Sequence, residues 1–208
     1  MLVLKKNLKL AVTETREFAN SLIRQKKQQM LKNPAGTSSK EAEDLLSRFL
    51  ISGHVDEKFV ADIIISFMLA GRDTTSSALT WFFWLLNKNI PPQDEIVKEI
   101  DKTHNSSIYQ EVKDMNYTHA ALCEGDEEKW KFVPRDPYSY PVFQAGPRVC
   151  LGRDMALLQM KRVVAGVLAR FRVVPLIDEG IEPVYLPYLT AKMKGGLPVR
   201  IEERALTR

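Results

Sequence analysis

The longest apolar segment of the chain, FVADIIISFMLAGRDTTSSALTWFFWLL from Phe59 to Leu86, most limits how this sequence can fold. It is long enough to span a membrane, but Asp62, Arg72 and Asp73 interrupt it. Each charge near the centre of a bilayer costs about 2.5 to 3.5 kcal/mol on insertion scales. The segment is therefore predicted to be a mostly buried helix of a soluble domain, about 42 Å long at about 1.5 Å per residue.

The rest of the pattern predicts a mainly α protein with a small β component at the C-terminus. Apolar residues recur at helical spacing between breaks rich in Pro, Gly and Ser, and Asp56 is expected to cap the long helix. We expect one domain over 1–208, helical over 1–124, with a loop, a last helix and strands over 125–208. The other predicted helices are 8–32, 40–50, 93–102, 111–124 and 151–171, and the predicted strands are 184–193 and 197–203, joined by a turn at 194–196.

Composition narrows the class of protein. Hydrophobic residues make up 45% and charged residues 27% of the 208 residues, an ordinary globular composition. The net charge of +4 is spread over several segments, which argues against a nucleic-acid interface. Cys123 and Cys150 lie far apart, so a disulfide scaffold is not expected and a reducing compartment is favoured. The N-terminal MLVLKKNLKLAV is broken by lysines and is neither a signal peptide nor a membrane span, so we expect no transmembrane segment in this chain.

Residues 143–152, FQAGPRVCLG, place one cysteine between two glycines just before a predicted helix. Cys150 at a helix N-terminus would face unpaired N–H groups and the positive end of the helix dipole, which favour the metal-binding thiolate. Gly146 and Gly152 would let the backbone approach a flat group closely. Arg148 offers a planar fork to an anionic edge. The alternative is a small buried cysteine beside a helix cap.

A second unusual run, AGRDTT from Ala70 to Thr75, lies in the middle of the long predicted helix. Glycine, aspartate and threonine weaken a helix interior because they lose more entropy or compete for backbone hydrogen bonds. A function for the small and polar side chains would explain their presence. The alternative is a kinked core helix stabilised by local bonding between Asp73 and a threonine.

Both runs resemble motifs of the haem-thiolate monooxygenases, the cytochrome P450 superfamily. The run AGRDTT resembles the oxygen-binding segment of that family's central helix. The segments FVPRDPYSYPVFQAGPRVCLGRDMALLQMKRVVAGVLARFRV and YLTAKMKGGLPVRIEE are similar to the plant fatty-acid hydroxylase branch, which includes omega-hydroxylases and enzymes that oxidise jasmonoyl-isoleucine. The cysteine loop fits the haem-ligand motif Phe-x-x-Gly-x-Arg-x-Cys-x-Gly at all its specified positions, Phe143, Gly146, Arg148, Cys150 and Gly152.

The resemblance implies a partial cytochrome P450 fold, built on a long central helix and a C-terminal haem-ligand loop. Ala70 and Gly71 would lie beside the iron, and Asp73 and Thr74 would deliver protons to bound dioxygen. The implied reaction inserts one oxygen atom from O2 into a C–H bond of a fatty-acid-like substrate. Electrons would come from NADPH through NADPH-cytochrome P450 reductase. The thiolate of Cys150 would be the axial ligand of haem b, in contact with the motif residues Phe143, Gly146, Arg148 and Gly152.

The chain also departs from the resembled family. Family members are more than twice this long, and an N-terminal anchor holds them at the cytosolic face of the endoplasmic reticulum. This chain is expected to lack that anchor and therefore to be cytosolic. The family's Glu-x-x-Arg pair has no arginine here, because Glu124 is followed by Glu127 at that spacing. The run Cys123 to Asp126 skips the segment that carries the family's small sheet and arginine-rich meander. A buried carboxylate without its cation costs about 3 to 5 kcal/mol. We therefore expect weak haem uptake or none, and a non-catalytic haem-binding remnant or a non-functional truncated product remains the alternative.

The remaining polar residues give weaker signals. The histidines are scattered and predict surface or capping roles instead of a metal site. Basic residues near the cysteine loop predict either a docking surface for an acidic reductase or an ordinary solvated face. The aromatic run from Trp81 to Trp84 is expected to pack in the core. The histidines are His54, His104 and His119, and the basic residues are Arg135, Arg153, Lys161 and Arg162.

Overall fold

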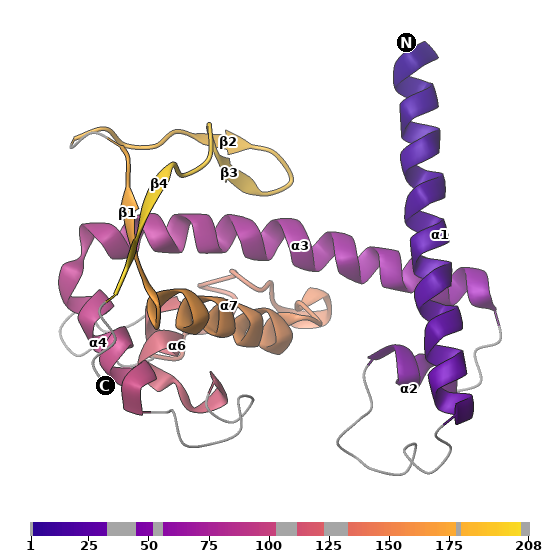
Figure 1. Cartoon of the computed structure of the whole chain (residues 1–208), viewed down its shortest axis with the longest axis horizontal. Helices are drawn as coiled ribbons and strands as arrows, with labels where there is room; N and C mark the ends of the chain where they lie inside the picture. The colour runs from indigo at the N-terminus through magenta and orange to yellow at the C-terminus, as the bar shows by residue number, and fades with distance from the viewer. Residues whose placement is uncertain are drawn as a thin grey trace. The chain divides into compact units, whose positions relative to one another are not determined.

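The computed structural model describes residues 2–32, 45–51, 56–102, 112–122, 133–177 and 180–204 (Figure 1). The chain forms two compact units, 1–72 and 73–208, and the boundary between them falls inside one helix. Helices dominate the described residues and strands are short, so the predicted mainly α class with a small β component is confirmed. The organisation as one domain stays a prediction.

The long predicted helix is α3 (Glu57–Lys88), which extends two residues beyond the predicted segment at each end. Its length is about 48 Å at about 1.5 Å per residue. The run Ala70–Thr75 is α-helical throughout. Asp56 Oδ1 accepts a hydrogen bond from the Lys58 N–H at 2.9 Å, so the predicted N-cap is confirmed.

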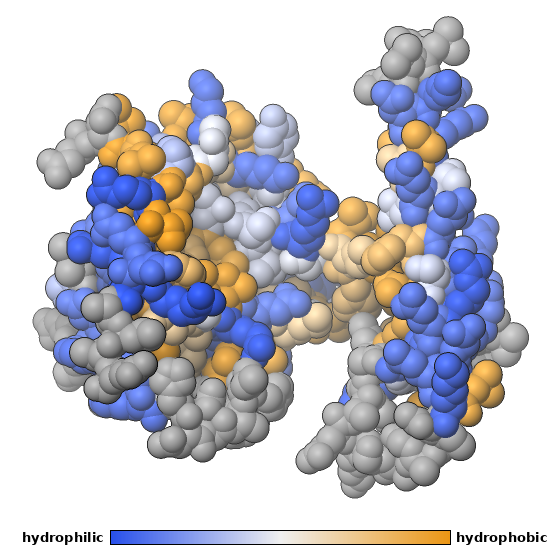
Figure 2. Space-filling model, in the orientation of Figure 1, coloured by the Kyte–Doolittle hydropathy of each residue, from blue (hydrophilic) through white to orange (hydrophobic). Residues whose placement is uncertain are grey.

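The first unit contains α1 (Leu2–Lys32), α2 (Leu45–Ile51) and the first half of α3. The helix α1 includes the predicted 8–32 helix, and the face of it seen in Figure 2 is mostly hydrophilic. An ion pair of 3.3 Å between Arg16 and Asp62 links α1 to α3. The core of this unit consists of Ala19, Ile23, Val60 and Ala61, with Leu46, Leu50, Ile64 and Ile65 packed against it.

The second unit packs three further helices against the second half of α3. They are α4 (Ile90–Lys102), α6 (Asn116–Leu122) and α7 (Arg153–Leu168). Phe82 is buried, whereas Trp81 and Trp84 are only half-buried, so the predicted burial of the aromatic run holds in part. The core consists of Phe82, Leu86, Ile96, Ile100, Met115, Val164 and Leu168.

The predicted helix 111–124 is interrupted. Residues 112–114 are helical, Met115 is not, and α6 starts at Asn116. The carboxylate of Glu99, on α4, accepts hydrogen bonds from the N–H of Tyr117 at 2.7 Å and from the N–H and hydroxyl of Thr118 at 2.8 and 2.7 Å. Glu99 therefore caps α6 from another helix, which local sequence patterns could not indicate.

The strands pair differently from the prediction. β1 (Phe171–Pro175) pairs with β4 (Val199–Glu203), and β2 (Tyr185–Pro187) pairs with β3 (Ala191–Met193), both antiparallel. The single strand predicted over 184–193 is thus a hairpin, and it does not pair with 197–203 (Figure 1). The last helix ends at Leu168 instead of Phe171, because β1 follows and takes a partner that is distant in sequence. The predicted turn at 194–196 is present, with φ of +79° at Gly195 and +75° at Gly196.

The β2–β3 hairpin is fixed to α3 through one carbonyl. The oxygen of Ala191 accepts hydrogen bonds from Ser77 Oγ and Trp81 Nε1, both at 2.7 Å. Lys192 Nζ adds an ion pair of 3.5 Å with Asp73. These contacts place the hairpin along the side of α3 that carries residues 73, 77 and 81.

We expect Glu99→Ala to lower the free energy of unfolding by about 2 kcal/mol, since it removes a helix cap made of three charge-assisted hydrogen bonds. Glu95→Ala on the same helix is the matched control. Glu95 forms an exposed pair with Lys98, and such pairs contribute about 0.5 kcal/mol or less. Urea denaturation followed by circular dichroism measures both, and equal effects would contradict the capping role.

Candidate functional site

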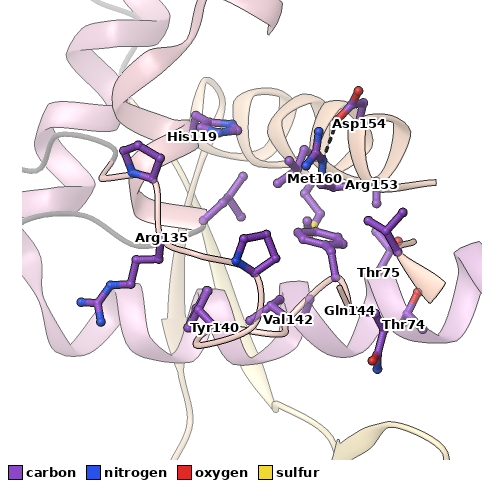
Figure 3. Close-up of a pocket in the computed structure, with 18 of the residues that line it drawn as sticks. Thr74, Thr75, His119, Arg135, Tyr140, Val142, Gln144, Arg153, Asp154 and Met160 are labelled. Atoms are coloured by element: carbon purple, nitrogen blue, oxygen red, sulfur yellow. Dashed lines mark hydrogen bonds and ion pairs between the residues drawn. The ribbon is translucent and has the colours of Figure 1, made fainter. Parts of the chain in front are cut away.

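A cavity of about 700 Å³ lies in the second unit between α3, α6, α7 and the loop that leads to Cys150 (Figure 3). This volume falls in the range of small-molecule and cofactor sites, about 300 to 1,000 Å³. Most of its wall is apolar or aromatic. The lining residues are Thr74, Thr75, Ala78, Phe82, His119, Leu122, Val133, Pro134, Arg135, Pro137, Tyr140, Val142, Phe143, Gln144, Val149, Arg153, Asp154, Ala156, Leu157 and Met160.

The wall formed by α3 carries an unsatisfied hydroxyl. Thr75 Oγ1 is buried and has no hydrogen-bond partner among the described residues. Thr80 on the same helix behaves in the usual way, because its Oγ1 donates to the Ser76 carbonyl at 2.8 Å. Leaving a buried hydroxyl unpaired costs about 1 to 3 kcal/mol. Thr75 lines the cavity, and its hydroxyl is thus an unsatisfied polar group in the cavity wall.

The loop before Cys150 is held by short-range hydrogen bonds. The Cys150 N–H donates to the Phe143 carbonyl at 2.8 Å, and the Val149 N–H donates to the Gly146 carbonyl at 3.1 Å. Gly146 has φ of +62°, and a Cβ there would lie 2.9 Å from the hydroxyl of Tyr138. We expected this glycine to make room for a flat group, but its positive φ already favours glycine without one.

Cys150 is a free and exposed cysteine, which excludes the alternative of a small buried core residue. It lies three residues before Arg153, the first residue of α7. Gly152 is the N-cap, and the nearest atom to a Cβ at this position is Cys150 Sγ at 4.0 Å. Nothing in the described part of the chain requires glycine at 152, so close approach of a bound group would explain it.

Only some of the predicted site residues line the cavity. Thr74 and Phe143 line the cavity. Asp73 pairs with Lys192 instead. Ala70 and Gly71 are exposed and belong to the first unit. The remaining predicted residues lie on the loop or its turn but not among the lining residues: Gly146, Arg148, Cys150 and Gly152.

His119 is the main site residue that the sequence did not indicate. We expected a surface or capping role, but His119 is half-buried on α6 and lines the cavity. Burial lowers its pKa from the usual 6.5, and the positive charges of Lys161 and Arg153 lower it further, while Asp154 opposes them. His54 and His104 lie outside the described residues. No local pattern could reveal this site, because it depends on how α6 packs against α7.

The predicted basic docking surface needs a correction at Lys161. This residue is 6% exposed, and its Nζ donates to the Lys113 carbonyl at 3.1 Å. The remaining basic residues, Arg135, Arg153 and Arg162, are exposed. Arg153 forms an ion pair of 3.0 Å with Asp154. Lys161 thus stabilises the fold and is not available to a partner.

The lining fits a flat, largely apolar group with anionic edges such as haem. Aromatic and aliphatic side chains form most of the wall, and Arg135 supplies positive charge at the surface, whereas the charge of Arg153 is paired with Asp154. A long helix and a cysteine-bearing turn that border one apolar cavity are the arrangement expected of a haem-thiolate protein.

No helix in the described residues is long and apolar enough to span a membrane.

Comparison with known proteins supports this class. The family model for cytochrome P450 matches residues 3–125 and 126–196. The chain is 46% identical to cytochrome P450 94A2 and 45% identical to cytochrome P450 94A1, both of Vicia sativa, over 97% and 96% of its length. The crystal structure of a cytochrome P450, CYP102L1, matches 93% of this chain and 56% of its own chain, with a TM-score of 0.67 at 16% identity. The chain therefore belongs to the cytochrome P450 family.

The chain spans about half the length of these Vicia sativa relatives, 51% and 50%. The alignment with P450 94A2 runs over 263 positions, whereas 97% of 208 residues is about 202, so about 61 positions of the relative have no counterpart here. The two matched stretches of the family model meet between Gly125 and Asp126. This agrees with the omission predicted between Cys123 and Asp126, a junction that lies outside the described residues.

We expect Thr75→Val to raise the free energy of unfolding of the haem-free chain by about 1 kcal/mol, because it removes a buried hydroxyl that has no partner. Thr80→Val is the matched control, and it should be neutral or destabilising since Thr80 donates to a backbone carbonyl. Chemical denaturation of both variants provides the comparison. A loss of stability in Thr75→Val would show that its hydroxyl has a partner after all.

We also expect the stability of the chain to fall as the pH drops below about 6.5. The folded state lowers the pKa of His119, so the unfolded state binds a proton first on acidification. Stability from this residue is complete above the unfolded pKa and is lost between that value and the lower folded one. His119→Gln should flatten the dependence of unfolding free energy on pH between about 7.5 and 5.5. An unchanged slope would contradict the assignment.

Proposed function

We propose that this chain is the haem-binding half of a monooxygenase that inserts one oxygen atom from O2 into a C–H bond of a fatty-acid-like substrate. The observation that carries the proposal is the cavity shared by Thr74 and Thr75 of α3 and by the loop that ends in Cys150. Family membership gives independent support.

The residues of the loop that ends in Cys150 have separate roles in the proposal. The hydrogen bond from the Cys150 N–H to the Phe143 carbonyl fixes the turn, so that the exposed Cys150 sulfur could bind the haem iron. The guanidinium group of Arg148 would neutralise a haem carboxylate, as the resemblance implies. When bound, haem supplies the activation of O2, favoured by electron density from the thiolate.

Proton delivery is assigned to the acid and alcohol on α3. Thr74 lines the cavity, and Thr75 brings a second hydroxyl to the same wall. Asp73 is adjacent in sequence but pairs with Lys192 at 3.5 Å, and both side chains are about half exposed. Asp73 would therefore act from the solvent-exposed side of α3, while the Thr74 hydroxyl would hold a proton at the cavity wall.

The substrate class, electron source and location follow from the resemblance to plant fatty-acid hydroxylases. Electrons would come from NADPH through NADPH-cytochrome P450 reductase, which would dock near the exposed Arg135 and Arg162. The complete enzyme would act at the cytosolic face of the endoplasmic reticulum.

The alternative is that this chain binds haem without turnover, or that it is a truncated product without a function. It is favoured by the roughly 61 positions that have no counterpart in this chain. In the resembled family the missing segment supplies the arginine that pairs with the carboxylate at the position of Glu124. Loss of one partner of a buried ion pair lowers fold stability by about 3 to 5 kcal/mol, so the absence of this arginine is expected to weaken the fold that holds haem.

We expect the purified chain to take up well below one haem per molecule, and the reduced carbon-monoxide complex of that haem to show the red-shifted Soret band of thiolate ligation. Cys150→Ser should abolish this band, whereas Cys123→Ser is the matched control and should retain it. Oxidation of lauric acid with added reductase separates the enzyme from the non-catalytic binder. Stable loading with one haem per chain would contradict the expected weakness, and absence of the thiolate band would overturn the proposal.

A further inference from the structure

One side of α3 holds the C-terminal segment 182–193, which we call the strap. Ser77 Oγ and Trp81 Nε1 both donate hydrogen bonds of 2.7 Å to the Ala191 carbonyl. Side chains four residues apart lie on the same face of a helix, so these two donors converge on one acceptor. The first residue of β3 is therefore fixed to α3 by two hydrogen bonds.

The same side of α3 contacts the strap at two further places. Towards the start of the helix, Lys192 Nζ lies 3.5 Å from Asp73 Oδ2. Towards its end, Lys88 forms an ion pair with Glu182 and lies 4.3 Å from the centroid of the Trp84 ring. These contacts use one continuous line of helix positions, spaced three or four residues apart: 73, 77, 81, 84 and 88.

The Asp73–Lys192 ion pair would be weak if it stood alone. The two side chains are 50% and 48% exposed, and exposed pairs hold two side chains together only weakly. Lys192, however, lies between the anchored Ala191 and Met193, which is 7% exposed. The backbone of Lys192 is thus held on both sides, and less conformational entropy is lost when its ammonium meets the carboxylate.

The ion pair holds the acid away from the cavity wall. Thr74 lines the cavity, whereas Asp73 and Lys192 are not among the lining residues. Adjacent helix positions differ by about 100°, so the Asp73 carboxylate has to leave Lys192 in order to turn towards Thr74.

We propose that Lys192 is a positioning residue that holds the Asp73 carboxylate outside the cavity while the strap is attached to α3. Release of the strap lets the carboxylate turn towards Thr74, so the strap controls the access of this acid to the cavity. The inference rests on the proposed function only in giving Asp73 and Thr74 their task in proton delivery. The position of the carboxylate itself is tested on the haem-free chain.

The first test is treatment of the full chain with a carbodiimide, which joins a lysine to a carboxylate where the two are in contact, followed by peptide mass spectrometry. The wild type should form an amide between Lys192 and Asp73. An amide between Lys88 and Glu182 is the internal reference at the other end of the strap. Formation of the reference product without the Lys192–Asp73 product would overturn the inference.

The second test is hydrogen exchange of the Lys194 amide, which donates to the Val184 carbonyl at 2.8 Å and measures opening of the hairpin. Ser77→Ala combined with Trp81→Phe should speed this exchange about tenfold or more. A two-stranded hairpin is marginally stable alone, and each lost hydrogen bond shifts an opening equilibrium by about fivefold.

The same measurement tests the ion pair. Lys192→Met and Asp73→Asn should each speed the exchange about twofold, and the double variant should exchange no faster than either single variant. Lys192→Arg should behave as the wild type, because it keeps the charge. Arg200→Met is the matched control, since it removes an exposed ion pair with Glu202 from the other sheet, and it should have no effect. Additive effects of the two single variants, or a Lys192→Arg variant as fast as Lys192→Met, would contradict a specific pair.

Control of proton delivery is measured on the hemin-loaded chain with added reductase, as the solvent deuterium isotope effect on oxidation of lauric acid. Lys192→Met should lower this isotope effect, because the carboxylate no longer has to leave Lys192, whereas Lys192→Arg should retain it. A larger isotope effect in Lys192→Met would show that Lys192 assists proton delivery and would overturn the inference. A chain that forms the Lys192–Asp73 amide but oxidises no substrate in any variant would contradict the proposed function while confirming the position of the acid.

Discussion

The apolar packing at one end of α3 and α7 is the interaction on which the second unit depends. Phe82 and Leu86 of α3 share one core with Val164 and Leu168 of α7, and α4 and α6 contribute to it. Towards the other end of both helices, Thr75 and Ala78 of α3 and Ala156, Leu157 and Met160 of α7 line the cavity. Phe82 belongs to both the core and the cavity wall, so the packing that joins the helices also forms one side of the cavity.

Neighbouring faces of α3 contact different parts of the second unit. Residues 74, 75, 78 and 82 line the cavity, whereas 73, 77 and 81 contact the β2–β3 hairpin. Asp73 and Thr74 are adjacent in sequence, but a step of about 100° along a helix directs them to different partners. The run that resembles an acid and alcohol pair is thus divided in this structure, because the Lys192 side chain engages the acid from outside the cavity.

The sequence predicted the elements whose signals are local. Helical spacing located α1, α3, α4 and α7, and Asp56 marked the start of α3. The place of the cysteine turn just before α7 was predicted from its glycines and from the helical spacing that follows it. In contrast, β1 and its pairing with β4 depend on residues about thirty positions apart, and the cap that Glu99 provides for α6 comes from another helix. His119 was missed for the same reason, since its role arises only when α6 packs against α7.

The positions omitted between Gly125 and Asp126 affect the charges at the site more than the packing of its walls. Both parts of the chain that flank the junction at Gly125 and Asp126 contribute to the cavity, α3 and α6 from before it and the cysteine loop and α7 from after it. The core residues come from these same flanking parts. Packing free energy can therefore preserve the walls of the cavity, because burial of apolar surface needs only the elements that remain. The proposed function implies that an arginine of the resembled family is omitted with these positions, so the expected loss is in the charges that hold a bound group and not in the packing of the walls.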